Sequence, residues 1–305
     1  MKTPILLTGA TGFIGRAILR SLTAGASDTV SVLARDIEQF AARGDVRALK
    51  GDLRDRVSLR RAVAGVETVV HAASYVGYDA RLGQDVNQDG TATLVEEALR
   101  AGVTRFIYVS TVGVLGRGPH RGTSKTPEPG SLSVLSQSRR EAEKTILGAG
   151  GISVRPALVV GKGDKWVVPQ IQQLTKRIGG VVDSGSAQLS MIHVRDVGKL
   201  VASLAHSHQP PHAPRSFIAA NPQPLAVSQL VQMMELQGLL RATDGRSFTR
   251  EEASHAVGPT SMHGLRALTD DYWFEADDLW KLSGLLPPDT LHLLTEDIDY
   301  YRRTL

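Results

Sequence analysis

The sequence predicts an α/β protein built on a doubly wound parallel sheet, with a smaller C-terminal lobe that binds substrate. Two observations support this fold class. A glycine-rich turn joins an apolar run at residues 5–7 to a helical segment at 16–22. Short apolar runs then alternate with segments of helical period through the first half of the chain, a pattern typical of parallel strands covered by helices on both faces.

The turn has the form of a dinucleotide phosphate site. Its glycines follow the spacing GxxGxxG, in which we expect Gly9 to allow the tight turn, Gly12 to let a cofactor approach the backbone and Gly15 to let helix pack on strand. Free N–H groups at the start of the helix would bind the phosphates. A plain tight turn can carry the same glycines, but the position between strand and helix favours the Rossmann-like interpretation. The predicted cofactor contacts here are Gly9, Thr11, Gly12, Phe13, Ile14 and Gly15.

The remaining elements follow in order. Strands are expected at residues 5–7, 30–34, 46–49, 66–70, 105–109 and 152–155. Helices are expected around 59–63 and 93–99, and a long Gly/Pro/Ser/Thr-rich loop at 116–130. We divide the chain into a Rossmann nucleotide-binding domain, residues 1–160, and a substrate-binding lobe, residues 161–305, interleaved with the sheet. Within the lobe, residues 233–264 depart from the α/β pattern, either as a lid over a large ligand or as a surface excursion.

Composition excludes several classes of protein. The 305 residues, 42% of them hydrophobic, suffice for a large core. The absence of cysteine excludes disulfides, thiolate catalysis and cysteine-ligated metals, and we expect no metal site. The net charge of +4 comes without a basic block, so no nucleic-acid partner is expected. No segment approaches the roughly 20 apolar residues of a membrane span, and the first strand begins too early for a signal peptide, so we expect a cytoplasmic protein.

Ordered motifs along nearly the whole chain resemble the extended short-chain dehydrogenases/reductases. Residues 51–55 (GDLRD) are similar to the family's adenine-contacting segment, and residues 69–74 (VVHAAS) to its strand beside the cofactor. The match continues in order through residues 86–91, 108–116, 154–161 and 191–197. The resemblance implies a nicotinamide dinucleotide cofactor and a small-molecule substrate. It assigns further cofactor contacts to Asp52, Leu53, Ala72, Ala73, Ser74, Pro156, Ala157 and Val159.

The choice of cofactor depends on the end of the second strand. Enzymes that use NAD place a carboxylate there for the ribose 2′-hydroxyl, whereas an arginine suits a 2′-phosphate. The strand ends Leu33-Ala34-Arg35-Asp36. Arg35 is therefore predicted to bind the 2′-phosphate of NADPH, and Asp36 to cap the helix that follows. The alternative is that Arg35 is a solvated surface charge and Asp36 the ribose ligand, which would give NAD.

The chain departs from the family at the catalytic helix. The family carries Tyr-x-x-x-Lys there, and alignment of residues 138–143 with the segment that follows puts Leu135 at the tyrosine position and Arg139 at the lysine position. A leucine cannot transfer a proton. The cation of Arg139 can still bind ribose hydroxyls. Thr111 matches the family's Ser/Thr that hydrogen-bonds the substrate oxygen, and is equally well explained as a strand-end turn residue.

Loss of the tyrosine favours ketone reduction over reactions that begin by oxidising an alcohol. Oxidation needs a base, whereas a new alkoxide can take its proton from water or from a hydroxyl on the substrate. We therefore expect an NADPH-dependent ketoreductase that acts on a hydroxyl-bearing polycyclic aromatic ketone. Without the Tyr-Lys pair, the chain resembles atypical ketoreductases of antibiotic biosynthesis. A nucleotide-sugar epimerase or dehydratase is disfavoured. The residues expected to line the substrate pocket, each also open to ordinary packing, are Tyr75, Tyr78, Trp166, Met191 and His193.

A non-enzymatic NADP(H) sensor is the alternative from another functional class. Leu135 favours it, because members of the superfamily without the tyrosine can bind cofactor and regulate a partner. Thr111, the retained cation of Arg139 and the nicotinamide segment at residues 156–159 count against it, since a sensor that holds only the adenine end needs none of them. The oligomeric state is left open.

Overall fold

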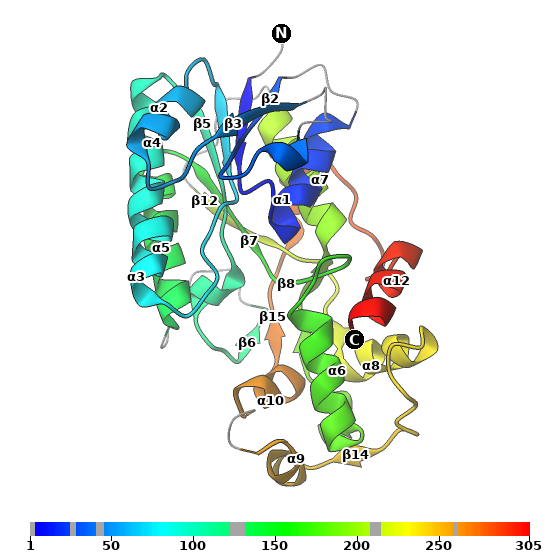
Figure 1. The fold of residues 1–305 in the computed structure, drawn as a ribbon. Coiled ribbons are helices and arrows are strands. Elements are labelled where there is room, and N and C mark those ends of the chain that lie inside the picture. Colours follow the sequence, from blue (N-terminus) through cyan, green and yellow to red (C-terminus); the bar gives the residue numbers. More distant parts are fainter. Residues whose placement is uncertain (1–3, 25–28, 41–45, 123–131, 208–214, 259–261) are drawn as a thin grey trace.

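A seven-stranded parallel sheet in the order β12-β7-β5-β4-β1-β2-β3 forms the centre of the molecule (Figure 1). The structure is a computed structural model that describes residues 4–24, 29–40, 46–122, 132–207, 215–258 and 262–305. Strand order reverses after β1 and every pairing is parallel, which confirms the predicted doubly wound fold. The strands are β1 (Ile5–Thr8), β2 (Val30–Ala34), β3 (Val46–Lys50), β4 (Thr68–His71), β5 (Arg105–Val109), β7 (Ile152–Pro156) and β12 (Arg215–Ala219).

Helices cover both faces of this sheet because its strands are apolar on both sides. In β1, Ile5 and Leu7 face one layer and Leu6 faces the other, and all three are buried. Figure 1 shows α1 and α7 on one side of the sheet and α2, α4 and α5 on the opposite side. The first layer contains α1 (Phe13–Thr23), α7 (Val194–His206) and α11 (Asp277–Ser283). The second layer contains α2 (Arg56–Ala62), α4 (Gly90–Arg100) and α5 (Val134–Gly148).

Short elements connect these layers at the edge where the strands end. They include η1 (Glu38–Phe40), α3 (Ala80–Gly83), η2 (Gln84–Asp89) and η3 (Val112–Leu115). The predicted loop at 116–130 contains the short strand β6 (His120–Arg121), and its later part, residues 123–130, lies outside the described residues.

The second lobe has its own apolar core and lies below the sheet in Figure 1. Its helices are α6 (Val167–Ile178), α8 (Val227–Leu236), α9 (Arg250–Val257), α10 (Met262–Thr269) and α12 (Thr295–Thr304). Its strands and its single turn of 3₁₀ helix are β8 (Leu158–Val160), β9 (Val181–Val182), η4 (Asp183–Gly185), β10 (Gln188–Leu189), β11 (Met191–His193), β13 (Leu225–Ala226), β14 (Ser247–Phe248) and β15 (Tyr272–Trp273). They form a four-stranded sheet, β13-β10-β15-β6, and the pairs β11-β8 and β14-β9.

The two parts of the chain share the main sheet. Both α7 and β12 come from residues beyond 160, yet α7 packs on α1 and β12 extends the sheet beside β7. The segment 233–264 contributes Leu239, Leu240 and Ala253 to the core of the lobe. Its role as a lid stays a prediction.

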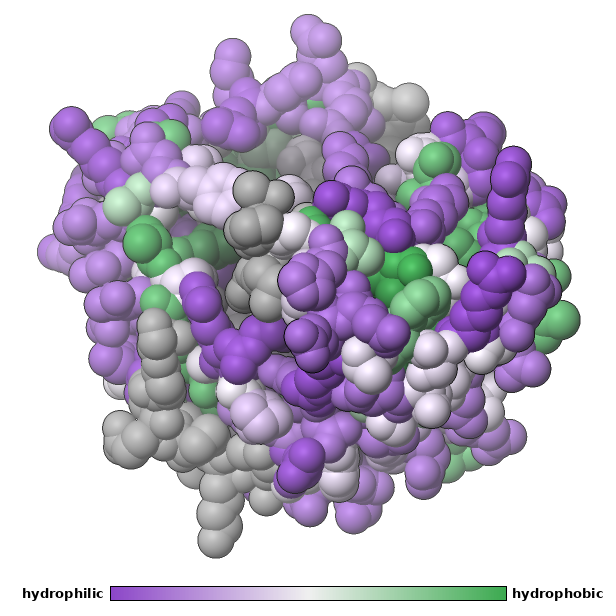
Figure 2. All heavy atoms as spheres, turned by 90° about the horizontal axis from the view of Figure 1, so that it is seen from below, coloured by the Kyte–Doolittle hydropathy of each residue, from purple (hydrophilic) through white to green (hydrophobic). Residues whose placement is uncertain are grey.

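Figure 2 shows one face of the lobe. Seen from below, the described atoms are mainly hydrophilic, with small separate apolar groups between them (Figure 2). Across the part of the chain that the structure describes, no helix is both long enough and apolar enough to span a bilayer.

Candidate functional site

The glycine turn between β1 and α1 fits a ligand that approaches the backbone closely. Gly9 has φ +77°, and a Cβ there would lie 2.4 Å from the Ala73 nitrogen. A Cβ on Gly15 would lie 1.9 Å from the Gly9 oxygen. Gly12 caps α1 without a side-chain hydrogen bond, and no acidic residue stands in the first turn. The helix therefore presents free N–H groups and the positive end of its dipole, as phosphate binding requires.

A cavity of about 600 Å³ opens beside this turn, along the edge where β1, β2 and β4 end. Its volume lies within the range of cofactor and ligand sites. It brings together most of the expected contacts for the adenosine and pyrophosphate. Those that line it are Gly9, Thr11, Gly12, Arg35, Asp52, Leu53, Ala72, Ala73 and Ser74, with Tyr75 beside them.

The adenosine end of this cavity carries more positive than negative charge. The side chain of Asp52 accepts from both Arg54 Nε at 3.0 Å and Arg54 Nη2 at 2.9 Å, and these hydrogen bonds hold the pKa of Asp52 below its usual value. Arg35 is exposed and makes no ion pair with any described residue. Asp36 Oδ1 accepts from the Glu38 nitrogen at 3.0 Å, at the start of a single 3₁₀ turn, η1, which stands where the sequence predicts a helix.

The wall of the cavity is tied to α5 by a buried asparagine. Asn87 Oδ1 accepts from Ser74 Oγ at 3.1 Å and from the Tyr75 nitrogen at 2.7 Å, while Asn87 Nδ2 donates to Ser138 Oγ at 3.0 Å. Tyr75 also accepts from the Asp79 nitrogen through its hydroxyl at 3.3 Å. The sequence marks residues 86–91 as a family motif but does not single out Asn87 as the link between cofactor wall and catalytic helix.

Helix α5 begins beside the end of β5 and carries Leu135 and Arg139, which we align with the family's tyrosine and lysine. Leu135 lies in its first turn, half-buried. Arg139 Nη2 donates to the Val109 oxygen at 3.1 Å and to the Ser110 oxygen at 2.8 Å, while its Nε is buried without a partner among the described residues. An unpartnered buried donor beside the strand ends is what a ribose hydroxyl would satisfy. Thr111 Oγ1 accepts from the Gly113 nitrogen at 3.1 Å, as the N-cap of η3.

A second cavity, of about 300 Å³, lies between α5, the loop after η3 and the second lobe. Gly113 lies between Ser136 and Thr111, because a Cβ there would lie 3.2 Å from Ser136 Oγ and 3.4 Å from Thr111 Oγ1. We take it as the candidate substrate cavity. Its lining residues are Gly113, Gly116, Arg117, Leu132, Ser133, Ser136, Leu158, Leu189, Arg266, Ala267, Asp270 and Tyr272.

None of the residues predicted to line the substrate pocket is among those that line this cavity. Tyr75 lines the nucleotide cavity instead. Tyr78 is 97% exposed and Trp166, the residue before α6, is 63% exposed. Met191 is buried in β11, where it pairs with Leu158 within the lobe's core. Their proposed substrate roles stay predictions.

His193 is held by structural contacts at both ring nitrogens. Its Nε2 lies 2.8 Å from Asp297 Oδ2, and its Nδ1 accepts from the Arg195 nitrogen at 3.2 Å to cap α7. Burial raises the pKa of Asp297, but hydrogen bonds from His193 and from the Leu294 and Lys162 nitrogens outweigh it, so the pKa lies below its ordinary value. The pair fixes α12 to α7.

The remaining expected cofactor residues, Arg139 among them, do not line the nucleotide cavity. Phe13, Ile14 and Gly15 form the first turn of α1. Pro156, Ala157 and Val159 are buried where β7 passes into β8. Their contacts with a cofactor also stay predictions.

Comparisons with known proteins agree with this architecture. The chain is 34% identical to sterol demethylase protein B of Methylococcus capsulatus over 171 residues, which are 52% of this chain and 52% of that protein. It thus spans about half the length of that relative. It is 27% identical to 2-alkyl-3-oxoalkanoate reductase of Stenotrophomonas maltophilia over 263 residues, 80% of this chain and 78% of that protein. Among solved structures, the enzyme WbmH of Bordetella bronchiseptica in complex with NAD+ superposes with a TM-score of 0.76 at 16% identity, covering 99% of both chains.

A family model identifies the chain more directly. The model described as "NAD dependent epimerase/dehydratase family" matches residues 5–219, the segment that runs from β1 through β12 and contains the glycine turn, Thr111 and α5. This match covers well over half of the chain. The protein belongs to the NAD-dependent epimerase/dehydratase family, the extended short-chain dehydrogenases/reductases.

Proposed function

We propose that the protein is a cytoplasmic NADPH-dependent ketoreductase, which reduces a ketone on a hydroxyl-bearing polycyclic aromatic metabolite of polyketide type. The proposal is supported by a glycine turn that opens on a nucleotide cavity, together with a leucine at residue 135, the position that we align with the family's tyrosine. Reductases stand beside epimerases and dehydratases among the relatives, and the 2-alkyl-3-oxoalkanoate reductase is one of them.

Arg35 supports NADPH as the cofactor. It lines the nucleotide cavity at the end of β2, is exposed, and makes no ion pair with any described residue. Its planar guanidinium can form two charge-assisted hydrogen bonds to a 2′-phosphate. Asp36, the competing ribose ligand, already accepts the Glu38 N–H.

We infer the direction of the reaction from the absence of a tyrosine at residue 135. The cofactor supplies hydride, so the chain must align donor and ketone and provide for a proton on the new alkoxide. Alignment alone can lower the barrier by about 7–11 kcal/mol. A general acid contributes roughly 10²–10⁴ in rate, which is about 3–5 kcal/mol. Reduction therefore survives the loss of the tyrosine, particularly when a hydroxyl on the substrate donates the proton, whereas alcohol oxidation lacks its base.

The retained polar groups have separate roles in this scheme. Arg139 is held by the Val109 and Ser110 oxygens and keeps a buried Nε without a partner among the described residues, and we assign this group to a ribose hydroxyl. Thr111 offers a hydroxyl to the substrate oxygen, beside the cavity that Ser136 lines. Neither residue is a proton donor near neutral pH, since arginine stays charged and a threonine hydroxyl stays protonated.

The test is consumption of NADPH with a panel of hydroxyl-bearing aromatic ketones, with UDP- and dTDP-sugars as controls. We expect reduction of at least one ketone and no interconversion of nucleotide sugars. A matched ketone whose neighbouring hydroxyl is methylated should react more slowly, by up to roughly 10²–10⁴. Turnover of a nucleotide sugar would contradict the proposal, and tight NADPH binding without reduction of any ketone would favour the sensor.

A further inference from the structure

The candidate substrate cavity has apolar walls and a surplus of positive charge. Its apolar lining comes from Leu132, Leu158, Leu189, Ala267 and Tyr272. Its charged lining consists of Arg117, Arg266 and Asp270. A cavity of about 300 Å³ is at the lower end of the range for ligand sites, so it suits a small, largely apolar molecule or one such part of a larger molecule.

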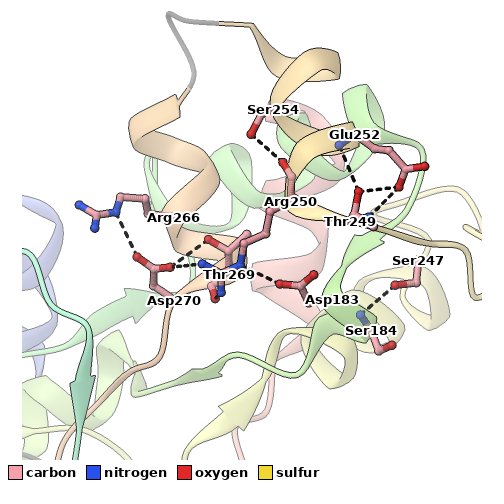
Figure 3. A network of polar contacts seen from close by, with 10 residues as sticks. All are labelled: Asp183, Ser184, Ser247, Thr249, Arg250, Glu252, Ser254, Arg266, Thr269 and Asp270. Atoms are coloured by element: carbon pink, nitrogen blue, oxygen red, sulfur yellow. Dashed lines mark hydrogen bonds and ion pairs between the residues drawn. The ribbon is translucent and has the colours of Figure 1, made fainter.

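Among the described residues that line this cavity, the carboxylate is that of Asp270, and it is paired with two arginines. Asp270 Oδ2 accepts from Arg266 Nε at 3.0 Å, and Asp270 Oδ1 accepts from Arg250 Nη1 at 3.1 Å. Figure 3 shows Asp270 between these two arginines. Arg250 also pairs with Asp183 at 2.7 Å and donates to the Thr269 oxygen, which fixes α9 and α10 to η4. Each carboxylate oxygen of Asp270 therefore already accepts a hydrogen bond from an arginine.

Arg117 is the charged residue of the cavity lining that takes no part in this network. It is exposed at the cavity, and within the described ranges no carboxylate lies at ion-pair distance from it and no hydrogen-bond acceptor is recorded for it. The neighbouring arginine, Arg121, pairs instead with Asp271 at 2.6 Å. Arg117 thus presents an uncompensated guanidinium to the ligand space.

The loop that carries Arg117 is firmly held. Gly116 and Gly118 on either side adopt φ +96° and +68°, conformations that favour glycine. The His120 nitrogen donates to the Asp271 oxygen at 2.8 Å as β6 pairs with β15, and the His120 ring packs against Tyr272 and Phe274. The backbone that carries Arg117 is thus fixed before a ligand arrives, so the entropy lost on binding is confined to the side chain.

We propose that Arg117 binds an anionic oxygen on the substrate, so that the cavity selects a ketone that carries an acidic group on the part that enters it. This inference rests on the proposed ketone reduction and names a feature of its substrate. Two sources share the chemistry: the carboxylate of an open-chain 3-oxo acid and the ionised phenol of an aromatic ketone. Ser133 Oγ and Ser136 Oγ, 3.0 Å apart on the cavity wall, offer further hydrogen bonds to oxygen.

The first experiment measures binding and turnover of matched ligands by the NADPH-loaded protein. The probes are 3-oxooctanoate with its methyl ester, and a phenolic aromatic ketone with its methyl ether. We expect the acid, the phenol or both to bind about tenfold more tightly than the neutral partner, the size of one charge-assisted hydrogen bond at a partly exposed site. The pair that shows the difference identifies the source of the anionic oxygen.

The second experiment removes the charge. Arg117→Gln should raise Kd and KM for the anionic ligand about tenfold, leave those for its neutral partner unchanged and have little effect on kcat. Arg117→Lys should restore part of the affinity. Arg20→Gln serves as the matched control, because Arg20 is an exposed arginine on α1 away from both cavities.

The outcomes separate this inference from the proposed function. Equal affinity for acid and ester and for phenol and ether, unchanged in Arg117→Gln, would overturn the inference even if the ketones are reduced. Binding of the anion that depends on Arg117, measured as a ligand-induced rise in Tm, would support it even if no ketone is reduced. Preference for a UDP-sugar over every ketone would overturn both.

Discussion

A buried histidine beneath the nucleotide cavity makes the stability of the protein depend on pH. His71 ends β4 and is fully buried between Thr8 Oγ1, 2.6 Å from Nδ1, and Thr91 Oγ1, 2.9 Å from Nε2. Burial, assisted by the positive charge of Arg139, lowers the pKa of His71 to about 3. Thr8 Oγ1 also accepts from the Ala73 nitrogen at 3.3 Å, and both residues line the nucleotide cavity. His71 therefore supports the floor of that cavity as a neutral ring.

The size of the effect follows from the two pKa values. In the unfolded chain the imidazole takes up a proton below its ordinary pKa of 6.5, whereas in the folded protein it stays neutral down to about 3. The stability that this site contributes is thus complete above pH 6.5 and is lost as the pH falls toward 3. Between about pH 7 and about pH 5 the free energy of unfolding should fall by about 2 kcal/mol from this residue alone.

Urea unfolding at a series of pH values measures this fall. We expect His71→Asn to be less stable at neutral pH but to lose about 2 kcal/mol less on acidification over this interval than the wild type. His255→Asn is the control, because His255 is exposed on α9 and should leave the pH profile unchanged. A His71→Asn profile parallel to that of the wild type would refute the assignment of a neutral buried ring.

Three further predictions concern the cofactor and the altered helix. Arg35→Ala should weaken NADPH binding by about 1.5–3 kcal/mol and leave NADH nearly unaffected; equal wild-type affinities for the two cofactors, by titration calorimetry, would discard the 2′-phosphate role. Leu135→Tyr should bring no large gain in kcat, and Arg139→Ala should weaken cofactor binding more than the chemical step, as single-turnover rates at saturating NADPH will show; a large gain for Leu135→Tyr would mean an ordinary site that has simply lost its acid. Gly15→Ala should abolish cofactor binding and destabilise the fold, since its Cβ would meet the Gly9 oxygen at 1.9 Å, whereas Gly148→Ala, with no atom within 4 Å of its Cβ, should be neutral or slightly stabilising; dinucleotide affinity and Tm distinguish the two.

A strand could be predicted from the sequence where its apolar run is long enough to identify it without knowledge of its neighbours in the fold. All six expected strands coincide with β1–β5 and β7, displaced at their ends by two residues or fewer. The strand β12 was not predicted, because Arg215–Ala219 follows no glycine signal and is recognisable only from its pairing with β7. The short strands of the lobe, two or three residues each, carry no periodicity at all.

The candidate site divides in the same way. A tight turn needs glycines at fixed positions, and the sequence shows them. The residues of the nucleotide cavity at Gly9, at Gly12 and after β2 and β4 could therefore be predicted from motif and position. The substrate cavity could not, because its walls come from segments far apart in the chain that meet only in the folded lobe. Arg117 and Ser136 have no local signal of function, and the pairing of Met191 with Leu158 could not be inferred from the sequence either.

The packing of α7 on α1 has a consequence for how the protein is made. Gly198 lies so close to α1 that a Cβ there would be 2.6 Å from the Ala17 oxygen, and Ile18 and Leu22 share one apolar layer with Leu200 and Val201. The helix that begins at the phosphate turn thus keeps an uncovered apolar stripe until the ribosome has released residues 194–206. A nascent chain or fragment that stops at residue 160 would present this stripe, and the open edge of β7, to chaperones and to other chains. Expression of the nucleotide-binding part by itself therefore needs a boundary beyond β12.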